Sequence, residues 1–453
     1  MALGFSLFDI RRILENHLQK EIDVCADLPI NKISTDTRAL AAGDLFVALR
    51  GENFDGHTFA ETALGQGASG LVVEQFLSLS RPLPQFMVKD TLGAYQAIAQ
   101  AWRQRFSIPV IGITGSVGKT TTKELTAAVL SLKGNVRKTA VNNNNEIGVP
   151  KTLLEVTPED DYAIIEMAMR GRGEIALLAE IAQPTIGLIT NVGTAHIGRL
   201  GSEQAIAEAK CELLATMPST SLAILNWDNL RLRTTAQQVW SGSVLSYGLE
   251  GGDIQGTLLD AHTLQVQGHC LPLPLPGRHN ASNYLAALAV AQALGIDWQP
   301  LTQGLPVELP SGRARRYTLD PDILLLDETY NAGLESMLAA LQLLRETPGQ
   351  RHIAVLGAMK ELGDRAPEFH DRVGQRVASL GINHLFLLAN DPMTDAIASG
   401  AAPVPCHVFT DHESLIQALQ AFMQPGDRLL FKASNSVGLG QVVGKLKAFE
   451  VAQ

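Results

Sequence analysis

Short apolar runs separated by polar and glycine-rich segments divide the chain into three patterned regions. Residues 34–88 hold apolar runs at 45–49, 70–74 and 85–88 around one helix-like stretch, a pattern typical of a small mixed α/β domain. A continuous apolar strand at 109–114 then enters a glycine loop, and the apolar segments DYAIIEM, TIGLIT and LAILN alternate with helical segments. This alternation predicts βαβ units on a parallel sheet.

A third α/β pattern follows a β-rich stretch at 241–276 and a long helix predicted over 281–294. Its strands are expected at 323–327, 353–357, 385–389 and 428–432. The sequence therefore predicts an α/β protein of three domains. These are a small mixed α/β domain at 1–88, a central domain with a mainly parallel sheet at 89–312, and a Rossmann-like domain at 313–453.

Composition narrows the class of protein. The 453 residues are 46% hydrophobic and 18% charged, as expected of a globular α/β protein. Lys and Arg number 36 against 46 Asp and Glu, which gives a net charge of −10 and no overall basic field for a nucleic acid. An anionic small substrate would have to be held by a few local cationic or backbone groups.

The same sequence predicts a cytoplasmic protein without a membrane span. Charges at Asp9, Arg11 and Arg12 come too early for a signal peptide, and no apolar run approaches the length of a membrane helix. Four cysteines lie far apart with no Cys-x-x-Cys pair: Cys25, Cys211, Cys270 and Cys406. This spacing is neither a disulfide framework nor a zinc pattern, and a reducing compartment fits it.

The segment TGSVGKTTTK (114–123) follows a strand and opens a predicted helix. Backbone N–H groups of such a loop, the helix N-terminus and a lysine converge on phosphate oxygens, so ATP or GTP is the expected ligand. Lys119 would reach the terminal phosphates and Thr120 would ligate Mg²⁺. Ile113 stands where the general motif has glycine, which makes the match a variant, and the alternative is a glycine loop without function. The residues expected around the phosphates are Thr114, Gly115, Ser116, Val117, Gly118, Lys119 and Thr120.

Two more predicted strands end in groups suited to a metal. Glu166 ends one buried strand, and Asn191 and His196 follow the next, at the edge where open α/β sheets bind ligands. A carboxylate there suits Mg²⁺. The alternatives are a solvent-facing glutamate and a structural histidine.

Lys210 occupies an unfavourable position for a charge. Ser202 is positioned to cap a helix in which Ile206, Lys210 and Leu213 fall on one apolar stripe. Either the lysine extends its ammonium to solvent, or the amine loses its charge or is converted into an anion with a partner.

Polar residues also gather in three other segments. Asn280 and Asn283 stand at the start of the long helix, where they could simply cap it. Asp327, Tyr330 and Asn331 follow a buried strand of the third region. Loops of the first region offer a polar pocket of Ser34, Thr35, Asp36, Arg38, Asn53, Asp55 and His57.

Together these segments resemble the Mur ligase family, the ATP-dependent amide-forming enzymes of peptidoglycan precursor synthesis, along nearly the whole chain. The resemblance rests on STDTRALAAGDLFVALRGENFDGHTF (34–59), TGSVGKTTTK, the asparagine-rich loop NNNNEIGVPKTLL (142–154) and DETYNAG. It implies a UDP-sugar-binding first domain, a central P-loop ATPase domain and a C-terminal domain that binds the incoming amine.

The resemblance also implies roles for single residues. Lys119 and Thr120 would bind the ATP phosphates and Mg²⁺, Glu166 would share that ion, and His196 would help to hold a second Mg²⁺. Lys210 matches the carbamylated lysine of the family, whose carbamate ligates Mg²⁺.

The resemblance also assigns residues to ATP and to the substrates. Asn280, Arg313 and Asp327 would contact ATP, with Arg313 reaching the γ-phosphate. The residues expected at the substrates are Ser34, Asp36, Arg38, Asn144, Asn145, Tyr330 and Asn331.

The implied reaction joins D-alanyl-D-alanine to UDP-N-acetylmuramoyl-tripeptide through an acyl phosphate, with ADP and phosphate as products. The alternatives are the family member that adds the third amino acid, a ligase of the folylpolyglutamate-synthetase type, a P-loop NTPase or kinase of other specificity, and an inactive binding module. The asparagine-rich loop argues against the first and the first domain against the second. We expect a monomer.

Three segments depart from the family pattern: YNAGLES for Y-N-A-N-P-x-S, GAMKELG for G-D-M-x-E-L-G, and KASN (432–435) for K-G-S-R. Two of them change the face expected to hold the amine, and Asn435 replaces an arginine that could contact a carboxylate.

Overall fold

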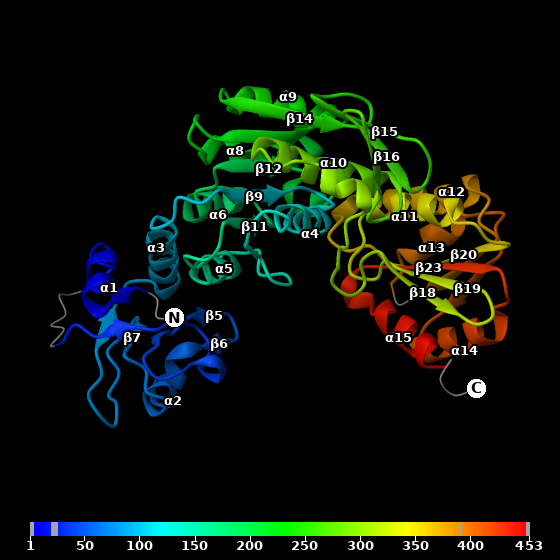
Figure 1. Ribbon diagram of the computed structural model, residues 1–453. Coiled ribbons are helices and arrows are strands. Elements are labelled where there is room, and N and C mark those ends of the chain that lie inside the picture. Colours follow the sequence, from blue (N-terminus) through cyan, green and yellow to red (C-terminus); the bar gives the residue numbers. More distant parts are fainter. Residues whose placement is uncertain (1–3, 20–25, 390, 450–453) are drawn as a thin grey trace. The chain divides into compact units, whose positions relative to one another are not determined.

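The computed structural model describes residues 4–19, 26–389 and 391–449, so Cys25 lies outside the described residues (Figure 1). The chain forms two compact units. One comprises residues 1–110, 135–167 and 177–184, and the other comprises 111–134, 168–176 and 185–453.

The first unit is built on a small parallel sheet, as expected for the first region. Its strand order is β3-β4-β7-β8, and each neighbouring pair is parallel. The strands are β3 (Ile33–Ser34), β4 (Leu45–Val47), β7 (Gly70–Val73) and β8 (Gln85–Met87). Phe46, Leu71 and Val73 pack with α2 (Ala60–Gly65) in one apolar cluster, which fixes the sheet against its helix.

Two short antiparallel pairs and several helical turns complete this part of the first unit. The pairs are β1 (Phe5–Ser6) with β2 (Pro29–Ile30), and β5 (Arg50–Gly51) with β6 (Phe54–Asp55). The helical elements are α1 (Leu7–Ile13), the 3-10 helices η1 (Thr37–Ala39) and η2 (Gly56–Phe59), and α3 (Thr91–Arg103).

The first unit also holds a parallel pair, β10 (Val136–Lys138) and β11 (Tyr162–Glu166), with the short helix α5 (Gly148–Leu154) between them in sequence. Glu166 is the last residue of β11, as predicted. It is buried, so the alternative of a solvent-facing glutamate is wrong.

The second unit begins with the strand that leads into the glycine loop. Seven strands follow one another in the order β9-β12-β13-β14-β15-β16-β17, and the pairs from β9 to β15 are parallel. The parallel strands are β9 (Val110–Thr114), β12 (Ile186–Ile189), β13 (Leu222–Asn226), β14 (Ser243–Gly248) and β15 (Ile254–Leu258). The β-rich stretch at 241–276 thus extends this sheet and ends in the antiparallel strands β16 (Thr263–Val266) and β17 (His269–Pro272).

Helices connect and cover these strands (Figure 1). They are α4 (Lys119–Leu130), α7 (Ile197–Leu200), α8 (Glu203–Thr216), α9 (Leu230–Val239), α10 (Arg278–Ala293) and the 3-10 helix η3 (Gln299–Gln303). Residues 177–182 of α6 (Glu174–Ala182) belong to the first unit. Helix α10 packs against α4 and β14, and α8 packs against α9 and β12. Because α10 is almost entirely buried and rich in alanine, it can approach α4 closely.

The C-terminal part carries a second open sheet of order β18-β19-β23-β20-β21-β22, in which only the β18–β19 pair is antiparallel. Its strands are β18 (Arg315–Leu319), β19 (Ile323–Asp327), β20 (Arg351–Gly357), β21 (His384–Leu388), β22 (Cys406–Phe409) and β23 (Asp427–Lys432). Its helical elements are α11 (Leu334–Glu346), η4 (Gly363–Arg365), α12 (Ala366–Ser379), α13 (Thr394–Gly400), α14 (His412–Phe422), η5 (Asn435–Val437) and α15 (Leu439–Phe449). This is the Rossmann-like arrangement that the third pattern predicts.

Three cysteines in the described part of the chain, Cys211, Cys270 and Cys406, are free thiols. Among the residues that the structure describes, no helix combines the length and the apolar character that a membrane span needs.

A buried ion pair ties two neighbouring strands of the C-terminal sheet. Asp427 is completely buried at the start of β23 and accepts hydrogen bonds from Arg351 Nε at 2.7 Å and Arg351 Nη2 at 2.6 Å. Removing the buried carboxylate takes away these two hydrogen bonds and a third from Gln424 N, and leaves a guanidinium that is only 23% exposed without its partner. This loss is costlier than that of a surface pair.

We therefore expect Asp427→Ala to lower the free energy of unfolding of the C-terminal part by about 3 kcal/mol, measured by urea denaturation. The matched control is Glu368→Ala, because Glu368 pairs with Arg365 in an exposed position and should change the denaturation midpoint little. Equal effects of the two variants would contradict this assignment.

Candidate functional site

The glycine loop lies between β9 and α4, as the motif predicts. Thr114 is the last residue of β9, Gly118 precedes α4, and Lys119 and Thr120 form the first turn of that helix. The Lys119 ammonium donates to the carbonyl of Gly115 at 2.7 Å, so it curls back over the loop. The buried hydroxyl Oγ1 of Thr114 has no hydrogen-bond partner among the described residues. Backbone donors, a cation and a helix N-terminus thus meet in one place, which fits a phosphate group.

Two glycines of this loop are required by close packing. Gly118 has φ +82°, and a Cβ there would lie 2.5 Å from Asn283 Oδ1. A Cβ at Gly115 would lie 1.9 Å from Thr190 Oγ1. Any side chain at either position would therefore displace the loop from its neighbours.

The segment after β12 holds the loop from the other side. Val117 donates its N–H to Asn191 Oδ1 at 3.0 Å, and its carbonyl accepts from Asn191 Nδ2 at 3.0 Å and Thr190 Oγ1 at 2.7 Å. Ser116 Oγ accepts from Gly193 N at 2.9 Å. Asn191 therefore lies where the sequence placed it, at the same sheet edge as the loop, and its amide fixes the loop backbone.

Lys210 is deeply buried in α8, with 1% of its surface exposed. Extension of the ammonium to solvent is therefore the wrong alternative. No hydrogen bond or ion pair joins it to another residue within the described ranges. Burial, and after it the charge of Lys119, hold the pKa of Lys210 well below its ordinary value of 10.5. Ser202 caps α8 as predicted, accepting from Ala205 N at 3.1 Å.

His196 belongs to the same site. Burial lowers its pKa, the charges of Lys119 and Lys210 lower it further, and Glu361 opposes them. The charges of Lys119 and Lys210 thus both act on the His196 ring. The ring nitrogen Nδ1 of His196 lies 2.6 Å from Glu361 Oε2.

Glu166 lies in the first unit. Its carboxylate accepts from Asn144 Nδ2 at 2.9 Å, and its backbone N–H donates to Thr139 Oγ1 at 2.9 Å. Asn145 Oδ1 accepts from Gly148 N at 2.9 Å and so closes the asparagine-rich loop at the start of α5. The structure thus joins Asn144 to Glu166, whereas the sequence assigned them to substrate and metal separately.

No cluster of three or more His, Cys, Asp and Glu side chains arranged for a metal occurs in the part of the chain that the structure describes. The predicted ligand set does not require one, because it combines a hydroxyl, one carboxylate, one imidazole and a modified lysine.

Ser34, Asp36 and Arg38 form a compact surface group after β3. Arg38 binds the Asp36 carboxylate with Nε at 2.9 Å and Nη2 at 2.7 Å, and Ser34 Oγ donates to the Asp36 carbonyl at 2.9 Å. The hydrogen bonds from Arg38 lower the pKa of Asp36 to about 2. The group lies at the carboxyl end of a parallel strand, the edge where such sheets bind ligands.

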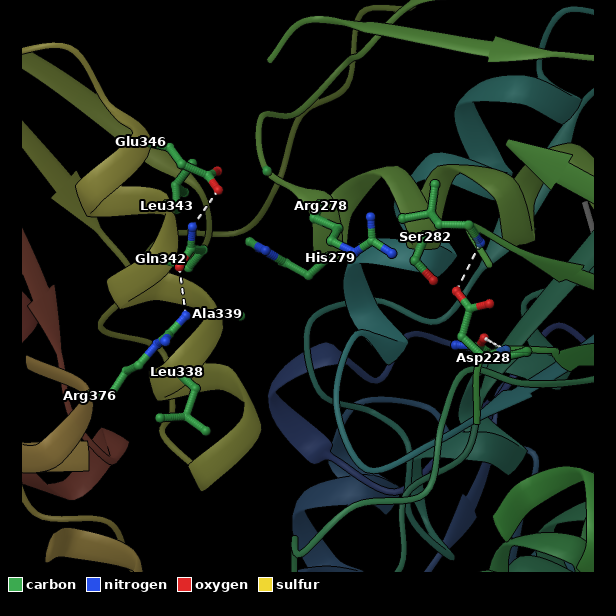
Figure 2. Close-up of a pocket in the computed structure, with 13 residues that line it drawn as sticks. Asp228, Arg278, His279, Ser282, Leu338, Ala339, Gln342, Leu343, Glu346 and Arg376 are labelled. Carbon is green, nitrogen blue, oxygen red and sulfur yellow. Dashed lines mark hydrogen bonds between the residues drawn. The ribbon is translucent and has the colours of Figure 1, made fainter. Parts of the chain in front are cut away.

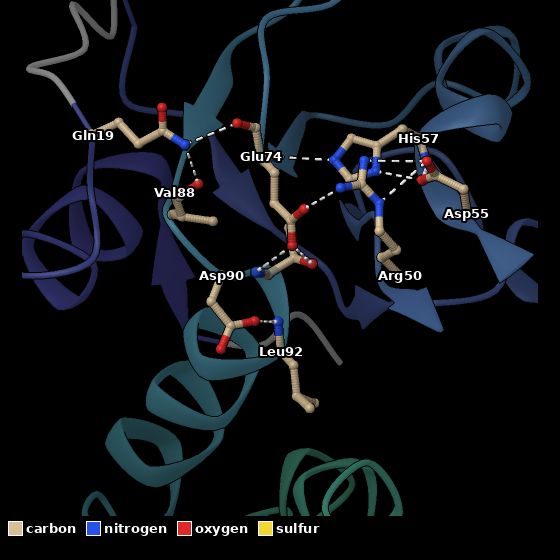
Figure 3. Close-up of polar contacts among 9 residues, drawn as sticks. Gln19, Arg50, Asp55, His57, Glu74, Val88, Asp90 and Leu92 are labelled. Carbon is tan, nitrogen blue, oxygen red and sulfur yellow. Dashed lines mark hydrogen bonds and ion pairs between the residues drawn. The ribbon is translucent and has the colours of Figure 1, made fainter. Parts of the chain in front are cut away.

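A second polar network at this edge has a structural role (Figure 3). His57 Nδ1 lies 2.6 Å from Asp55 Oδ1, and His57 Nε2 accepts from Glu74 N at 2.9 Å. The Glu74 carboxylate binds Arg50 Nη1 at 2.9 Å and accepts from the Thr91 hydroxyl at 3.2 Å. Both ring nitrogens of His57 are occupied, so the expectation that His57 faces a ligand is not supported by its contacts.

Asn280 and Asn283 do not cap their helix. Helix α10 begins at Arg278 after Gly277, which supplies no side chain. Asn280 Nδ2 donates to the carbonyl of Pro276 at 2.8 Å, and Asn283 Oδ1 accepts from Thr122 at 3.3 Å beside the glycine loop. Asn283, which the sequence left without a role, is thus a direct neighbour of the phosphate loop.

A cleft of about 390 Å³ lies beside this helix end (Figure 2). Arg278, His279 and Ser282 of α10 form one side, and Gln342 of α11 and Arg376 of α12 belong to the other. Burial and the charge of Lys432 lower the pKa of His279 to about 4. No residue of the predicted site lines the cleft.

The predicted residues of the C-terminal part lie together. The Arg313 guanidinium stacks 3.8 Å above the centre of the Tyr330 ring, and Asp327 Oδ1 accepts from the Thr329 hydroxyl at 2.6 Å. Lys432 Nζ donates to the carbonyl of Asn331 at 2.8 Å. Asn435 donates to the carbonyl of Tyr330 at 3.1 Å, so the residue that departs from the family pattern supports the backbone beside Tyr330.

The sequence did not indicate two acidic contacts to the segment after β12. Glu335 of α11 accepts from Thr194 N at 2.7 Å, and Glu361 contacts His196. Glu361 is the glutamate of the G-D-M-x-E-L-G pattern, which was the signal that could have drawn attention to it, whereas Glu335 stands at the unspecified position of Y-N-A-N-P-x-S and carried no such signal.

A phosphate-binding loop on a parallel sheet, with a buried lysine and a histidine beside it and a second open α/β sheet downstream, defines a nucleotide-dependent P-loop enzyme. Three family models match the chain. They are the Mur ligase family catalytic domain over residues 29–100, the Mur ligase middle domain over 113–291 and the Mur ligase glutamate ligase domain over 312–435. The chain belongs to the Mur ligase family of ATP-dependent ligases.

Individual relatives match along almost the whole chain. The UDP-N-acetylmuramoyl-tripeptide–D-alanyl-D-alanine ligase of Synechocystis sp. is 65% identical over 449 residues, which cover 99% of each chain. The Escherichia coli enzyme of the same name is 37% identical, with coverage of 98% of this chain and 99% of the relative.

Solved structures of related proteins share the fold over almost the whole chain. MurF from Acinetobacter baumannii gives a TM-score of 0.88 at 30% identity over 98% of this chain and 99% of that one. MurF ligase from Thermotoga maritima in complex with ADP gives 0.83 at 29% identity over 93% and 98%.

The burial of Lys210 predicts a pH dependence of stability. Because its pKa is lowered in the folded protein, the unfolded chain binds more protons at pH values between that lowered pKa and 10.5. The free energy of unfolding contributed by this site therefore rises with pH across that window. Lys210→Met, which keeps the apolar stem, should be more stable than the parent at pH 7, and the difference should shrink toward pH 10.

Chemical denaturation of both proteins in CO₂-free buffer measures this difference. A gap that stays constant from pH 7 to 10 would show that Lys210 does not titrate as its burial requires.

Proposed function

We propose that this chain joins D-alanyl-D-alanine to UDP-N-acetylmuramoyl-tripeptide at the expense of ATP, giving the pentapeptide, ADP and phosphate. The observation that carries the proposal is a phosphate loop that holds Lys119, together with the buried Lys210, in a chain 65% identical to a ligase of that name. The T. maritima structure with ADP supports ATP as the nucleotide.

The proposed division of labour follows the three regions of the sequence. Residues 1–88 bind the UDP-sugar, residues 89–312 bind ATP, and residues 313–453 bind the incoming dipeptide. Ser34, Asp36 and Arg38 at the carboxyl edge of the first sheet support the first role, because Arg38 can exchange its exposed contact with Asp36 for a phosphate oxygen.

Around the nucleotide, the backbone of residues 114–118 and the Lys119 ammonium hold the phosphates. Asn280 of α10 and Arg313, in the segment before β18, are proposed to contact the nucleotide. Asp327, the last residue of β19, is proposed to contact it as well. Arg313 fits this role because its Nε is buried and has no hydrogen-bond partner among the described residues.

Two Mg²⁺ ions are proposed, held by Thr120 and Glu166 and by His196 and modified Lys210. The Thr120 hydroxyl, the Glu166 carboxylate and a carbamate on Lys210 supply the oxygen donors that Mg²⁺ prefers, and His196 supplies one nitrogen. When bound, Mg²⁺ offsets the repulsion between the two anions that must react.

Lys210 is proposed to carry a carbamate. Its lowered pKa favours the neutral amine, whose lone pair would attack CO₂ to form an N–C bond with release of one proton. The product is a carboxylate-like anion, which gives the buried site the oxygen ligand that an amine cannot supply.

The reaction needs two steps, because a carboxylate is a poor electrophile. The terminal carboxylate of the tripeptide attacks the γ-phosphorus of ATP, which breaks its bond to the β-phosphate oxygen and releases ADP. The amine of D-alanyl-D-alanine then attacks the acyl phosphate, forms the amide and expels inorganic phosphate with loss of a proton. Lys119 neutralises charge in the first step, and Tyr330 and Asn331 border the amine in the second.

Asn144 and Asn145 are proposed to border the tripeptide, with Asn144 also orienting Glu166. The cytoplasmic location and the monomeric state stay predictions from the sequence.

The direct test is phosphate release from ATP and Mg²⁺ with UDP-N-acetylmuramoyl-tripeptide, with and without D-alanyl-D-alanine, and with the product followed by mass. Release that requires both substrates and yields the pentapeptide is the expected result. Product from the UDP-muramoyl-dipeptide and a single amino acid would instead favour the family member that adds the third residue.

Lys119→Ala should abolish turnover in this assay, because the phosphates lose their nearest cation. Lys133→Ala is the matched control: Lys133 is exposed just beyond the same helix and should keep the parent rate. Full activity of Lys119→Ala would exclude the phosphate-loop assignment.

Lys210→Ala should be nearly inactive and should regain part of its activity in the presence of acetate or another small carboxylate, which can occupy the space of the carbamate. Lys119→Ala should gain nothing from the same additive, which separates replacement of a ligand from a general salt effect. Normal activity of Lys210→Ala without additive would rule out the carbamate.

A further inference from the structure

The segment Gly193–Gly198, which follows β12, receives two carboxylates from the C-terminal part of the chain. Glu335, in the first turn of α11, accepts from Thr194 N at 2.7 Å and from Thr194 Oγ1 at 3.1 Å. The contact is tight, because a Cβ at Gly193 would lie 2.6 Å from the Glu335 carboxyl. The N-terminal turn of α11 is thereby held against this segment.

Glu361 makes the second contact. One carboxylate oxygen lies 2.6 Å from His196 Nδ1, and the Glu361 carbonyl accepts from Gly198 N at 3.2 Å. A Cβ at Gly198 would lie 2.5 Å from Gly363 N, so the two backbones touch at this point. Side chain and backbone of the 361–363 turn therefore bind the histidine segment together.

The backbone is strained on both sides of this contact. His196 has φ 66° and Glu361 has φ 63°, both in the left-handed region that non-glycine residues rarely adopt. Such conformations persist where the surrounding contacts determine them, and they are concentrated at functional sites.

The pairing fixes the orientation of the imidazole. An ionised carboxylate only accepts hydrogen bonds, so the proton of neutral His196 resides on Nδ1 and the lone pair of Nε2 is available. Histidines that bind a metal usually donate their second N–H to a carboxylate in this way, which holds the ring in the binding geometry. The same segment reaches the phosphate loop, since Gly193 N donates to Ser116 Oγ at 2.9 Å.

We propose that Glu361 is a positioning residue that orients His196 from the C-terminal part of the chain, so that docking of that part completes the metal site beside the phosphate loop. Glu335 strengthens the docking without touching the imidazole. This inference rests on the proposed function for the identity of the ion. Its consequence is that Mg²⁺ binding beside the phosphate loop depends on a residue of the C-terminal part.

The test uses the full chain labelled with ¹⁵N-histidine at pH 8, compared with Glu361→Ala, Glu361→Gln and Glu335→Ala. Long-range ¹H–¹⁵N spectra report which ring nitrogen carries the proton, and the His196 signal is assigned by its loss in His196→Ala. Binding of a non-hydrolysable ATP analogue at increasing Mg²⁺ concentrations gives the concentration for half-maximal binding. Thermal denaturation verifies that each variant is folded.

We expect the parent and Glu361→Gln to hold the proton on Nδ1, because the glutamine oxygen still accepts. Glu361→Ala should lose this preference and need about tenfold more Mg²⁺ for half-maximal binding. Glu335→Ala should keep the tautomer of the parent, which distinguishes orientation of the ring from docking alone.

The inference fails if Glu361→Ala is folded and retains both the Nδ1–H tautomer and the Mg²⁺ requirement of the parent. It also fails if Glu335→Ala shifts the tautomer as strongly as Glu361→Ala does. Failure of the parent to form the pentapeptide would overturn the proposed function and leave the tautomer result unaffected, so the two failures are distinguishable.

Discussion

The close packing of the phosphate loop is the constraint on which the rest of the second unit depends. Gly115 touches Thr190 and Gly118 touches Asn283, so the loop has no space for a side chain on either side. These contacts require the end of strand β9, the segment after β12 and the first turns of α10 to meet at one point. Hydrogen bonds from Asn191 and Thr190 to Val117 then keep the loop backbone in place before any ligand arrives.

This rigid loop determines the electrostatics around it. Lys119 lies over the loop, and its charge acts on both His196 and Lys210. Two lysines near one histidine would be unfavourable in an apolar interior if all were charged. The burial of Lys210 reduces this conflict, because it lowers the pKa of Lys210 and so favours the neutral amine, the form that can be modified.

Much of this arrangement could be predicted from the sequence, because it depends on local patterns. Apolar runs predicted where the strands lie along the chain, TGSVGKTTTK predicted the loop, and Lys210 on an apolar stripe pointed to a buried amine. The structure agrees in each case.

The remainder depends on contacts between distant segments, which no local pattern encodes. Asn280 and Asn283 were expected to be possible caps, but the helix begins two residues before Asn280 and turns Asn283 toward the loop. His57 was expected in a ligand pocket, but Asp55 and the Glu74 backbone occupy its ring. Glu335 and Glu361 are more than 130 residues from the segment that they contact, so spacing along the chain could not reveal them.

The central claim is that the tripeptide carboxylate is phosphorylated before the amide forms. The most direct measurement uses UDP-N-acetylmuramoyl-tripeptide with ¹⁸O in its terminal carboxylate and follows the isotope in the released phosphate by mass. The account predicts one ¹⁸O atom in each phosphate released with pentapeptide, because the carboxylate oxygen that attacks phosphorus leaves with it. Phosphate without the label, formed at the same rate as the pentapeptide, would contradict it.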